Sequence, residues 1–143
     1  AMEPQLNEKH LTLQTDFAKN ASDKPVMVTG DREALTRVLT NLLNNAVKFT
    51  PEEGVIAVIT KLHHQGPRVV EVRVEDSGPG IAPEEAHQVF DRFYKSDRSR
   101  TGKAGSGLGL FIVKSILQEH GQHIRVERSS MGGAAFVFTL PLA

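Results

Sequence analysis

The sequence contains no cysteine, which excludes disulfides and thiolate metal sites and is compatible with a reducing compartment. It also has no net charge, because lysine plus arginine and aspartate plus glutamate number 17 each. Bulk charge therefore gives no reason to expect a nucleic-acid or membrane-surface partner. No apolar run approaches the roughly 20 residues of a membrane-spanning helix, and no secretory leader is recognised. With 39% apolar residues, the 143-residue chain is expected to form a single domain, residues 1–143.

The stretch Asp31–Thr50 has the clearest periodicity and predicts an amphipathic helix with Asp31 as its N-cap. Asn41, Asn45 and Lys48 form a polar stripe on the flank of its apolar face. Amide oxygens suit a hard cation and lysine offers a charge for phosphate, so the stripe would fit a magnesium nucleotide. A solvated helix flank is the simpler interpretation of these three residues alone. The apolar face consists of Leu35, Val38, Leu39, Leu42, Leu43 and Ala46.

Six runs of β-prone residues are expected to form strands, and two of them, joined by residues 63–67, are expected to form a hairpin. In the second run of this hairpin, Val70, Val72 and Val74 share one face. Asp76 follows in phase with them, which aims a carboxylate into the apolar layer, where it needs a hydrogen-bond donor. The predicted strands are residues 11–17, 26–29, 55–62, 68–75, 123–128 and 135–140.

Two glycine-rich stretches stand out in the second half of the chain. Residues 76–81 (D-S-G-P-G-I) leave room for a planar group or a water beside the backbone, or form a simple turn. Residues 105–110 (G-S-G-L-G-L) lead into an apolar helix ending at His120-Gly121, and would present backbone amides to phosphate. Between them a short helix is expected from residue 82, followed by an irregular segment, residues 91–106. This segment concentrates positive charge, which favours a polyanion bound nearby, although a solvated loop is the simpler interpretation. Its basic residues are Arg92, Lys95, Arg98, Arg100 and Lys103.

Four motifs now stand in order: N-L-L-N-N-A-V-K-F-T (41–50), D-S-G-P-G-I (76–81), F-D-R-F-Y-K-S-D (90–97) and G-S-G-L-G-L (105–110). Together they resemble the N, G1, F and G2 boxes of the catalytic and ATP-binding domain of sensor histidine kinases, in the GHKL or Bergerat-fold superfamily. The resemblance spans about residues 11–140. It implies an α+β fold, a two-layer α/β sandwich with a mixed sheet of about five strands, three helices on one face, and a flexible ATP lid at residues 91–106.

The resemblance also implies roles for individual residues. Asp76 would accept a hydrogen bond from the adenine amino group, and Asn45 would be the Mg²⁺ ligand. The catalytic set would be Asn45, Lys48 and Lys95, with Lys95 neutralising charge on the γ-phosphate. Phe90 and Phe93 would pack under the lid or dock on the helices that present the substrate histidine. The other implied ATP contacts are Asn41, Phe49, Gly78, Gly80, Ile81, Phe93, Arg98, Arg100, Gly105, Ser106, Gly107, Leu108, Gly109 and Leu110.

The function so implied is transfer of the γ-phosphoryl group of MgATP to a histidine on a separate dimerisation domain, with a response regulator downstream. None of the six histidines is followed by an acidic residue, so none is expected to be the acceptor. Relatives imply a cytoplasmic domain, monomeric alone, from a homodimer anchored in the bacterial membrane. The alternatives are a non-catalytic nucleotide sensor, an anti-sigma-type serine kinase and an ATP-hydrolysing clamp or chaperone. Related ATPases carry a water-activating glutamate where this chain has Asn41, which argues against hydrolysis.

Overall fold

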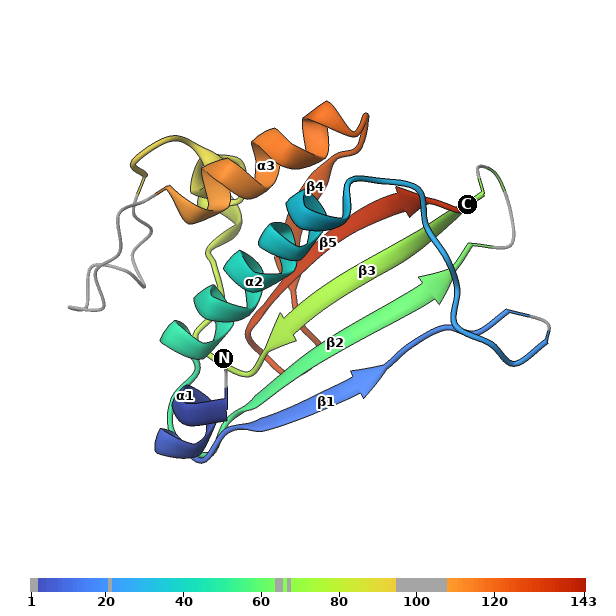
Figure 1. Cartoon of the computed structure of the whole chain (residues 1–143). Coiled ribbons are helices and arrows are strands. Elements are labelled where there is room, and N and C mark those ends of the chain that lie inside the picture. The colour runs from blue at the N-terminus through green and yellow to red at the C-terminus, as the bar shows by residue number, and fades with distance from the viewer. Residues whose placement is uncertain (1–2, 21, 64–65, 67, 95–107) are drawn as a thin grey trace.

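The structure, a computed structural model, describes residues 3–20, 22–63, 66, 68–94 and 108–143. In these residues a five-stranded sheet carries α-helices on one face, with α2 and α3 side by side across it (Figure 1). This confirms the predicted α+β, two-layer architecture. None of the helices in the described ranges is long and apolar enough to cross a membrane. The elements are α1 (Glu3–Glu8), β1 (Thr12–Asp16), α2 (Arg32–Phe49), β2 (Val55–Leu62), β3 (Val69–Asp76), the 3₁₀ turns η1 (Pro83–Glu85) and η2 (Gln88–Phe90), α3 (Gly109–Glu119), β4 (Ile124–Arg128) and β5 (Ala134–Pro141).

The sheet has the strand order β1-β2-β3-β5-β4 and is mixed, because β1 pairs with β2 in parallel and the other neighbours are antiparallel. The predicted hairpin is confirmed as the antiparallel pair β2 and β3. β3 and β5 occupy the centre, where Val74 lies opposite Phe136 and Val72 opposite Phe138. All four side chains face the helices and are buried, so they anchor the core.

The core lies between the central strands and the two long helices. Val38 and Leu42 of α2 meet Val113 and Leu117 of α3 over Phe136, and all of them are almost completely buried. Each such side chain contributes about 1.5 to 3 kcal/mol of burial free energy. The periodicity of Asp31–Thr50 therefore identified the helix face that holds the two layers together.

Both ends of α2 are capped. At its start, the Asp31 carboxylate accepts hydrogen bonds from the amides of Glu33 and Ala34, as the sequence predicts for an N-cap. At its end, Lys9 reaches in from the turn between α1 and β1. Its ammonium donates to the carbonyls of Val47 (2.8 Å), Lys48 (3.2 Å) and Thr50 (3.0 Å). A cation among these carbonyls also complements the negative end of the helix dipole.

Three details differ from the sequence prediction. Residues 26–29 are not a strand: Val28 makes only an isolated bridge to Leu142, since this segment runs beside the end of β5 for too short a distance to form a ladder. The single helix expected from residue 82 is instead η1 and η2, whose i to i+3 hydrogen bonds begin at Ala82. The short helix α1 was not predicted, and it is held by Leu6, which packs against Ala46 and Ile56.

The face of the sheet that the helices leave open carries a network of ion pairs. Arg73 donates to Glu75 (2.9 Å) and Glu127 (2.7 Å), while Ser129 donates to Glu75 (2.7 Å). Glu75 alternates with the buried valines and so falls on the other face of β3, yet it is only 5% exposed, because Ser129 covers it from a turn distant in sequence. Burial opposes its ionisation, but the hydrogen bonds from Arg73 and Ser129 and the charge of Arg73 hold the pKa of Glu75 below its usual value. A hydrogen bond from Arg73 likewise lowers the pKa of Glu127.

Candidate functional site

Asp76 is the centre of the candidate site. It ends β3 in phase with the buried valines, as predicted, and is only 1% exposed. Its Oδ1 accepts hydrogen bonds from the backbone amides of Gly78 (2.9 Å) and Ala134 (3.2 Å). The donors that a buried carboxylate requires therefore come from the loop that follows it and from the start of β5.

Glycines allow the backbone to approach this carboxylate closely. A Cβ at position 133 would lie 2.3 Å from both the backbone oxygen and Oδ1 of Asp76, and 2.7 Å from the amide nitrogen of Gly78. A Cβ on Gly78 would lie 2.8 Å from the carbonyl oxygen of Phe49 and 3.1 Å from Asp76 Oδ1. Gly78 was a predicted site residue, whereas Gly133 was not: it falls between the predicted strands 123–128 and 135–140. No local signal distinguished Gly133, because its importance arises from a contact with a residue 57 positions earlier.

α2 carries the first sequence motif and contacts the second and the fourth. The close approach of Gly78 to Phe49 places the first glycine-rich loop against its C-terminal end. At the other end of the stripe, Asn41 Nδ2 donates to the carbonyl oxygen of Gly109 (3.3 Å), the first residue of α3. From position 41 to 49 the helix rises about 12 Å. The site is therefore an elongated strip, with Asp76 near one end and the start of α3 at the other.

Asn45 and Lys48 lie between these two ends and are both partly buried. Asn45 Nδ2 is buried and has no hydrogen-bond partner in the described part of the chain. A buried polar group without a partner normally costs stability, which makes this carboxamide a candidate for ligand binding. Lys48 holds its ammonium 5.4 Å from the centre of the Phe49 ring, which keeps the charge close to the helix.

The donor set around Asn45 fits a divalent cation bound together with phosphate. Rotation of its carboxamide exchanges Nδ2 and Oδ1, so this position can present an oxygen ligand to a hard cation. Among the described residues no group of three or more His, Cys, Asp or Glu side chains could hold a metal ion. A cation here would therefore need most of its ligands from phosphate and water, which is the usual coordination of Mg²⁺ in nucleotide sites.

The start of α3 supplies backbone amides. The N-cap is Leu108, whose side chain offers no acceptor for the first amides of the helix, and Leu110 follows in the first turn. The helix dipole adds positive potential at this end. Leu108, Gly109 and Leu110, the predicted phosphate contacts, therefore lie at the start of α3, next to Asn41.

The two phenylalanines of the third motif have different environments. Phe90 is buried and packs edge to face on Phe136, with ring centroids 6.0 Å apart. Phe93 is 61% exposed and has a positive φ of 64°, a conformation that is costly for a residue with a side chain. Arg92 stacks over both Phe93 (5.3 Å) and Phe111 (5.7 Å). Phe93 is therefore available for an external contact, whereas Phe90 belongs to the core.

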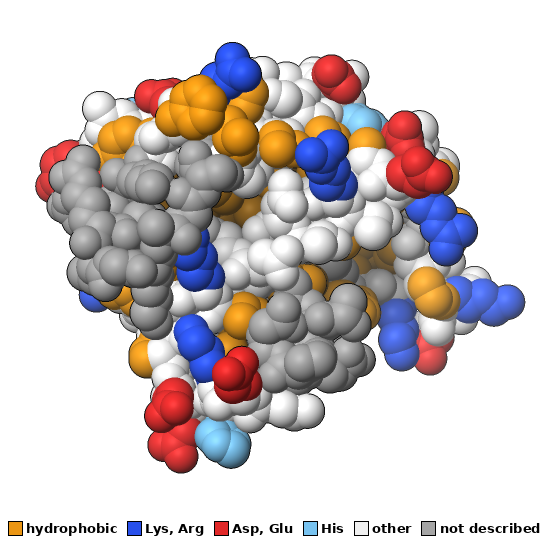
Figure 2. All heavy atoms as spheres, turned by 60° about the vertical axis from the view of Figure 1, so that its left-hand side comes forward, with side chains coloured by type: hydrophobic (Ala, Val, Ile, Leu, Met, Phe, Trp, Pro, Cys, Tyr) orange, Lys and Arg blue, Asp and Glu red, His pale blue; other side chains and the backbone are white. Residues whose placement is uncertain are grey.

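Several predicted site residues cannot be placed, because they lie outside the described residues: Lys95, Arg98, Arg100, Gly105, Ser106 and Gly107. Most of the predicted lid lies there too. The C-terminal end of α2 and the start of α3 point toward one side of the molecule (Figure 1). Figure 2 shows that face: Lys and Arg side chains lie near its middle with an acidic side chain beside them, and charged side chains of both signs lie toward its margin. An anionic ligand would therefore meet favourable charge there.

Known proteins share this arrangement. Residues 30–143 match the family of histidine kinase-, DNA gyrase B-, and HSP90-like ATPases. Sensor histidine kinase WalK of Bacillus subtilis is 36% identical over 127 residues, which are 88% of this chain and 21% of that protein. Sensor protein SrrB of Staphylococcus aureus is 46% identical over 114 residues, which are 79% of this chain and 19% of that protein. The chain thus spans about a fifth of the length of these two relatives.

Solved structures agree with the sequence relatives. Mycobacterial sensor histidine kinase MprB superimposes with a TM-score of 0.79 at 32% identity, covering 99% of this chain and 89% of that one. Full-length ShkA in complex with AMPPNP superimposes with a TM-score of 0.80 at 30% identity, covering 99% of this chain and 28% of that one. The chain therefore belongs to the histidine kinase-, DNA gyrase B-, and HSP90-like ATPase family, in the branch formed by the ATP-binding catalytic domains of sensor histidine kinases.

Proposed function

We propose that this chain binds MgATP along the flank of α2 and positions its γ-phosphoryl group for transfer to a histidine on a separate dimerisation domain. When bound, MgATP supplies the phosphoryl group, and Mg²⁺ neutralises part of its charge. The residues of this chain would bind and orient the nucleotide and neutralise its phosphate charge, since phosphoryl transfer needs little covalent chemistry from the protein.

The buried carboxylate of Asp76 is the observation that carries this proposal. A carboxylate fixed by two backbone amides, at the bottom of a glycine-lined approach, is suited to accept a hydrogen bond from an exocyclic amino group. Gly78, Gly80 and Ile81 would border the base. Phe49 supports the same end of the site through its contact with Gly78.

The remainder of α2 would serve the triphosphate. Asn45 would ligate Mg²⁺ through its amide oxygen, and Lys48 would neutralise phosphate charge. The first amides of α3, at Gly109 and Leu110, would hold phosphate oxygens at the other end of the strip. Lys95 is proposed from the sequence alone to neutralise the γ-phosphate, with Arg98 or Arg100 sharing this task.

Asn41 supports phosphotransfer over hydrolysis. A general base at this position would need to accept a proton from water, which an amide cannot do. Asn41 also donates to the carbonyl oxygen of Gly109, a hydrogen bond that an ionised glutamate could not make. We therefore propose that the γ-phosphate is hydrolysed slowly and waits for the imidazole of the partner domain.

We further propose the partners and location that accompany this function in relatives. The domain would work with the dimerisation domain of its own kinase and pass phosphate to a response regulator. The full-length protein would be a homodimer anchored in the bacterial membrane, with this domain in the cytoplasm. Exposed Phe93 offers a contact for the dimerisation helices.

The test is a phosphotransfer assay with labelled ATP. We expect label on the histidine of the dimerisation helices when they are mixed with this chain and Mg²⁺, as an acid-labile and base-stable phosphate. The chain alone should neither become labelled nor release phosphate steadily. Label on this chain would contradict the proposed acceptor, and steady phosphate release without the helices would favour the clamp or chaperone ATPase. Nucleotide binding without any label on the helices would favour a non-catalytic sensor.

A further inference from the structure

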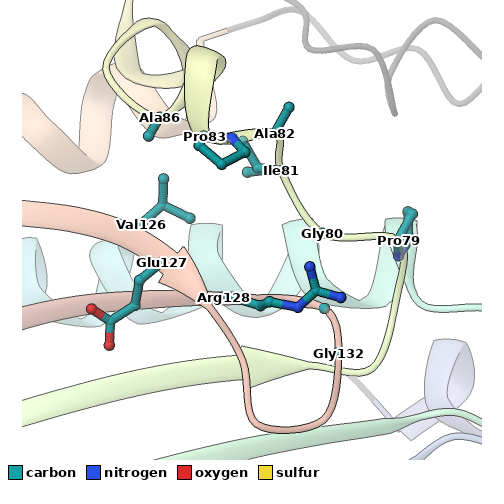
Figure 3. A pocket seen from close by; sticks show the side chains of 11 residues that line it. Pro79, Gly80, Ile81, Ala82, Pro83, Ala86, Val126, Glu127, Arg128 and Gly132 are labelled. Atoms are coloured by element: carbon teal, nitrogen blue, oxygen red, sulfur yellow. The ribbon is translucent and has the colours of Figure 1, made fainter.

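A cavity of about 410 Å³ borders the loop that follows Asp76. Figure 3 shows it between this loop and the strand β4, with the turn that precedes β5 at its base. Its volume falls within the range of about 300 to 1,000 Å³ that is usual for small-molecule sites. The lining residues are Pro79, Gly80, Ile81, Ala82, Pro83, Ala86, Val126, Glu127, Arg128, Gly132 and Gly133.

This cavity is not the proposed nucleotide site. No residue of α2 or α3 lines it, and neither does Asp76. The two sites have Gly80, Ile81 and Gly133 in common. A ligand could therefore bind in this cavity without nucleotide.

The walls of the cavity are mostly apolar, from the prolines and from Ile81, Ala82, Ala86 and Val126. Two charged side chains line it, and only one of them is engaged elsewhere. Glu127 pairs with Arg73 (2.7 Å) and Arg125 (3.2 Å), and its carboxylate points away in Figure 3. Arg128 extends across the cavity toward Gly80 (Figure 3) and makes no salt bridge with any described residue. The uncompensated charge at the cavity is therefore positive.

We propose that this cavity binds a small monocarboxylate with an apolar body. The guanidinium of Arg128 would take the carboxylate in a bidentate pair, which is the geometry that arginine favours. The apolar part would lie between Ile81 and Val126. Gly133 lies against Asp76 and Gly78, and the next residue, Ala134, donates to Asp76, so a bound ligand would also shift the amide signal of Ala134.

The experiment uses 4-phenylbutyrate as the probe and ¹H–¹⁵N NMR spectra of the nucleotide-free chain as the readout. We expect saturable shifts at the amides of Gly80, Ile81, Gly132 and Gly133. The neutral analogue 4-phenylbutanamide should bind more weakly, because it cannot form the ion pair. Shifts centred on Asn45 and Lys48, or no saturable shifts, would overturn the proposal.

Two variants and one control sharpen the test. Arg128→Gln should weaken binding of the probe by about fivefold or more, since it removes a charge-assisted pair. Ala86→Leu should occupy part of the cavity and weaken binding. The matched control Arg68→Gln removes the same charge at an exposed position outside the cavity, and should bind as the parent chain does. Equal affinity in the parent and Arg128→Gln would refute the assigned ligand class, and thermal unfolding of each variant verifies that it is folded.

Discussion

Replacing Asp76 by asparagine separates nucleotide binding from folding. Oδ1 of Asp76 accepts hydrogen bonds from the amides of Gly78 and Ala134, and an asparagine Oδ1 can accept the same two. The substitution also removes a buried charge, which offsets part of the weaker hydrogen bonding. We therefore expect Asp76→Asn to remain folded, with a melting temperature within about 4 °C of the parent.

Nucleotide affinity should fall much further in the same variant. The second carboxylate oxygen becomes an NH₂ group, so a donor would face the adenine amino group where an acceptor is required. Loss of a hydrogen bond to a charged group costs about 1.5 to 3 kcal/mol, which is about a 10-fold to 150-fold increase in Kd. Isothermal titration calorimetry with MgATP measures this, and exposed Asp16→Asn serves as the control. A Kd for Asp76→Asn within twofold of the parent would refute the placement of adenine.

Three further substitutions test other contacts. Gly133→Ala should destabilise the domain by about 1 to 3 kcal/mol in chemical denaturation, because its Cβ would meet the backbone and carboxylate of Asp76 at 2.3 Å; unchanged stability would mean that this turn is loosely packed. Lys9→Met should cost about 1.5 kcal/mol by removing the three hydrogen bonds at the end of α2, whereas exposed Lys61→Met should cost almost nothing. Because the pKa of Glu75 is lowered from its ordinary value near 4.5, its ionised form stabilises the fold at pH values above 4.5, and this stabilisation is lost as the pH falls through the lowered pKa. Glu75→Gln should therefore make the free energy of unfolding less dependent on pH in the acid range. An unchanged pH dependence would contradict the ion-pair network around Glu75.

The sequence was most informative where a strict period applies. The helix period of Asp31–Thr50 predicted both the buried face and the flank with Asn45, and the alternation of β3 predicted that Asp76 points inward. Helix periodicity and strand alternation can be recognised within one segment, without knowing which distant residues it contacts. The α+β fold, in contrast, was implied by the resemblance of the four motifs to those of sensor histidine kinases.

Features that depend on contacts between distant residues were not predictable. Gly133 is essential to the packing around Asp76, yet its sequence context reads only as a turn. Glu75 alternates as a surface residue and is buried because Ser129 covers it. The β-prone residues 26–29 failed to form a strand, because tertiary placement beside the end of β5 overrode local propensity.

The most direct test of the central claim is a crystal structure of the chain with AMPPNP and Mg²⁺. We predict the adenine amino group within hydrogen-bond distance of the Asp76 carboxylate, Mg²⁺ ligated by Asn45, and the phosphates directed toward the start of α3 at Gly109. A ligand bound elsewhere, or an adenine that makes no contact with Asp76, would contradict the account.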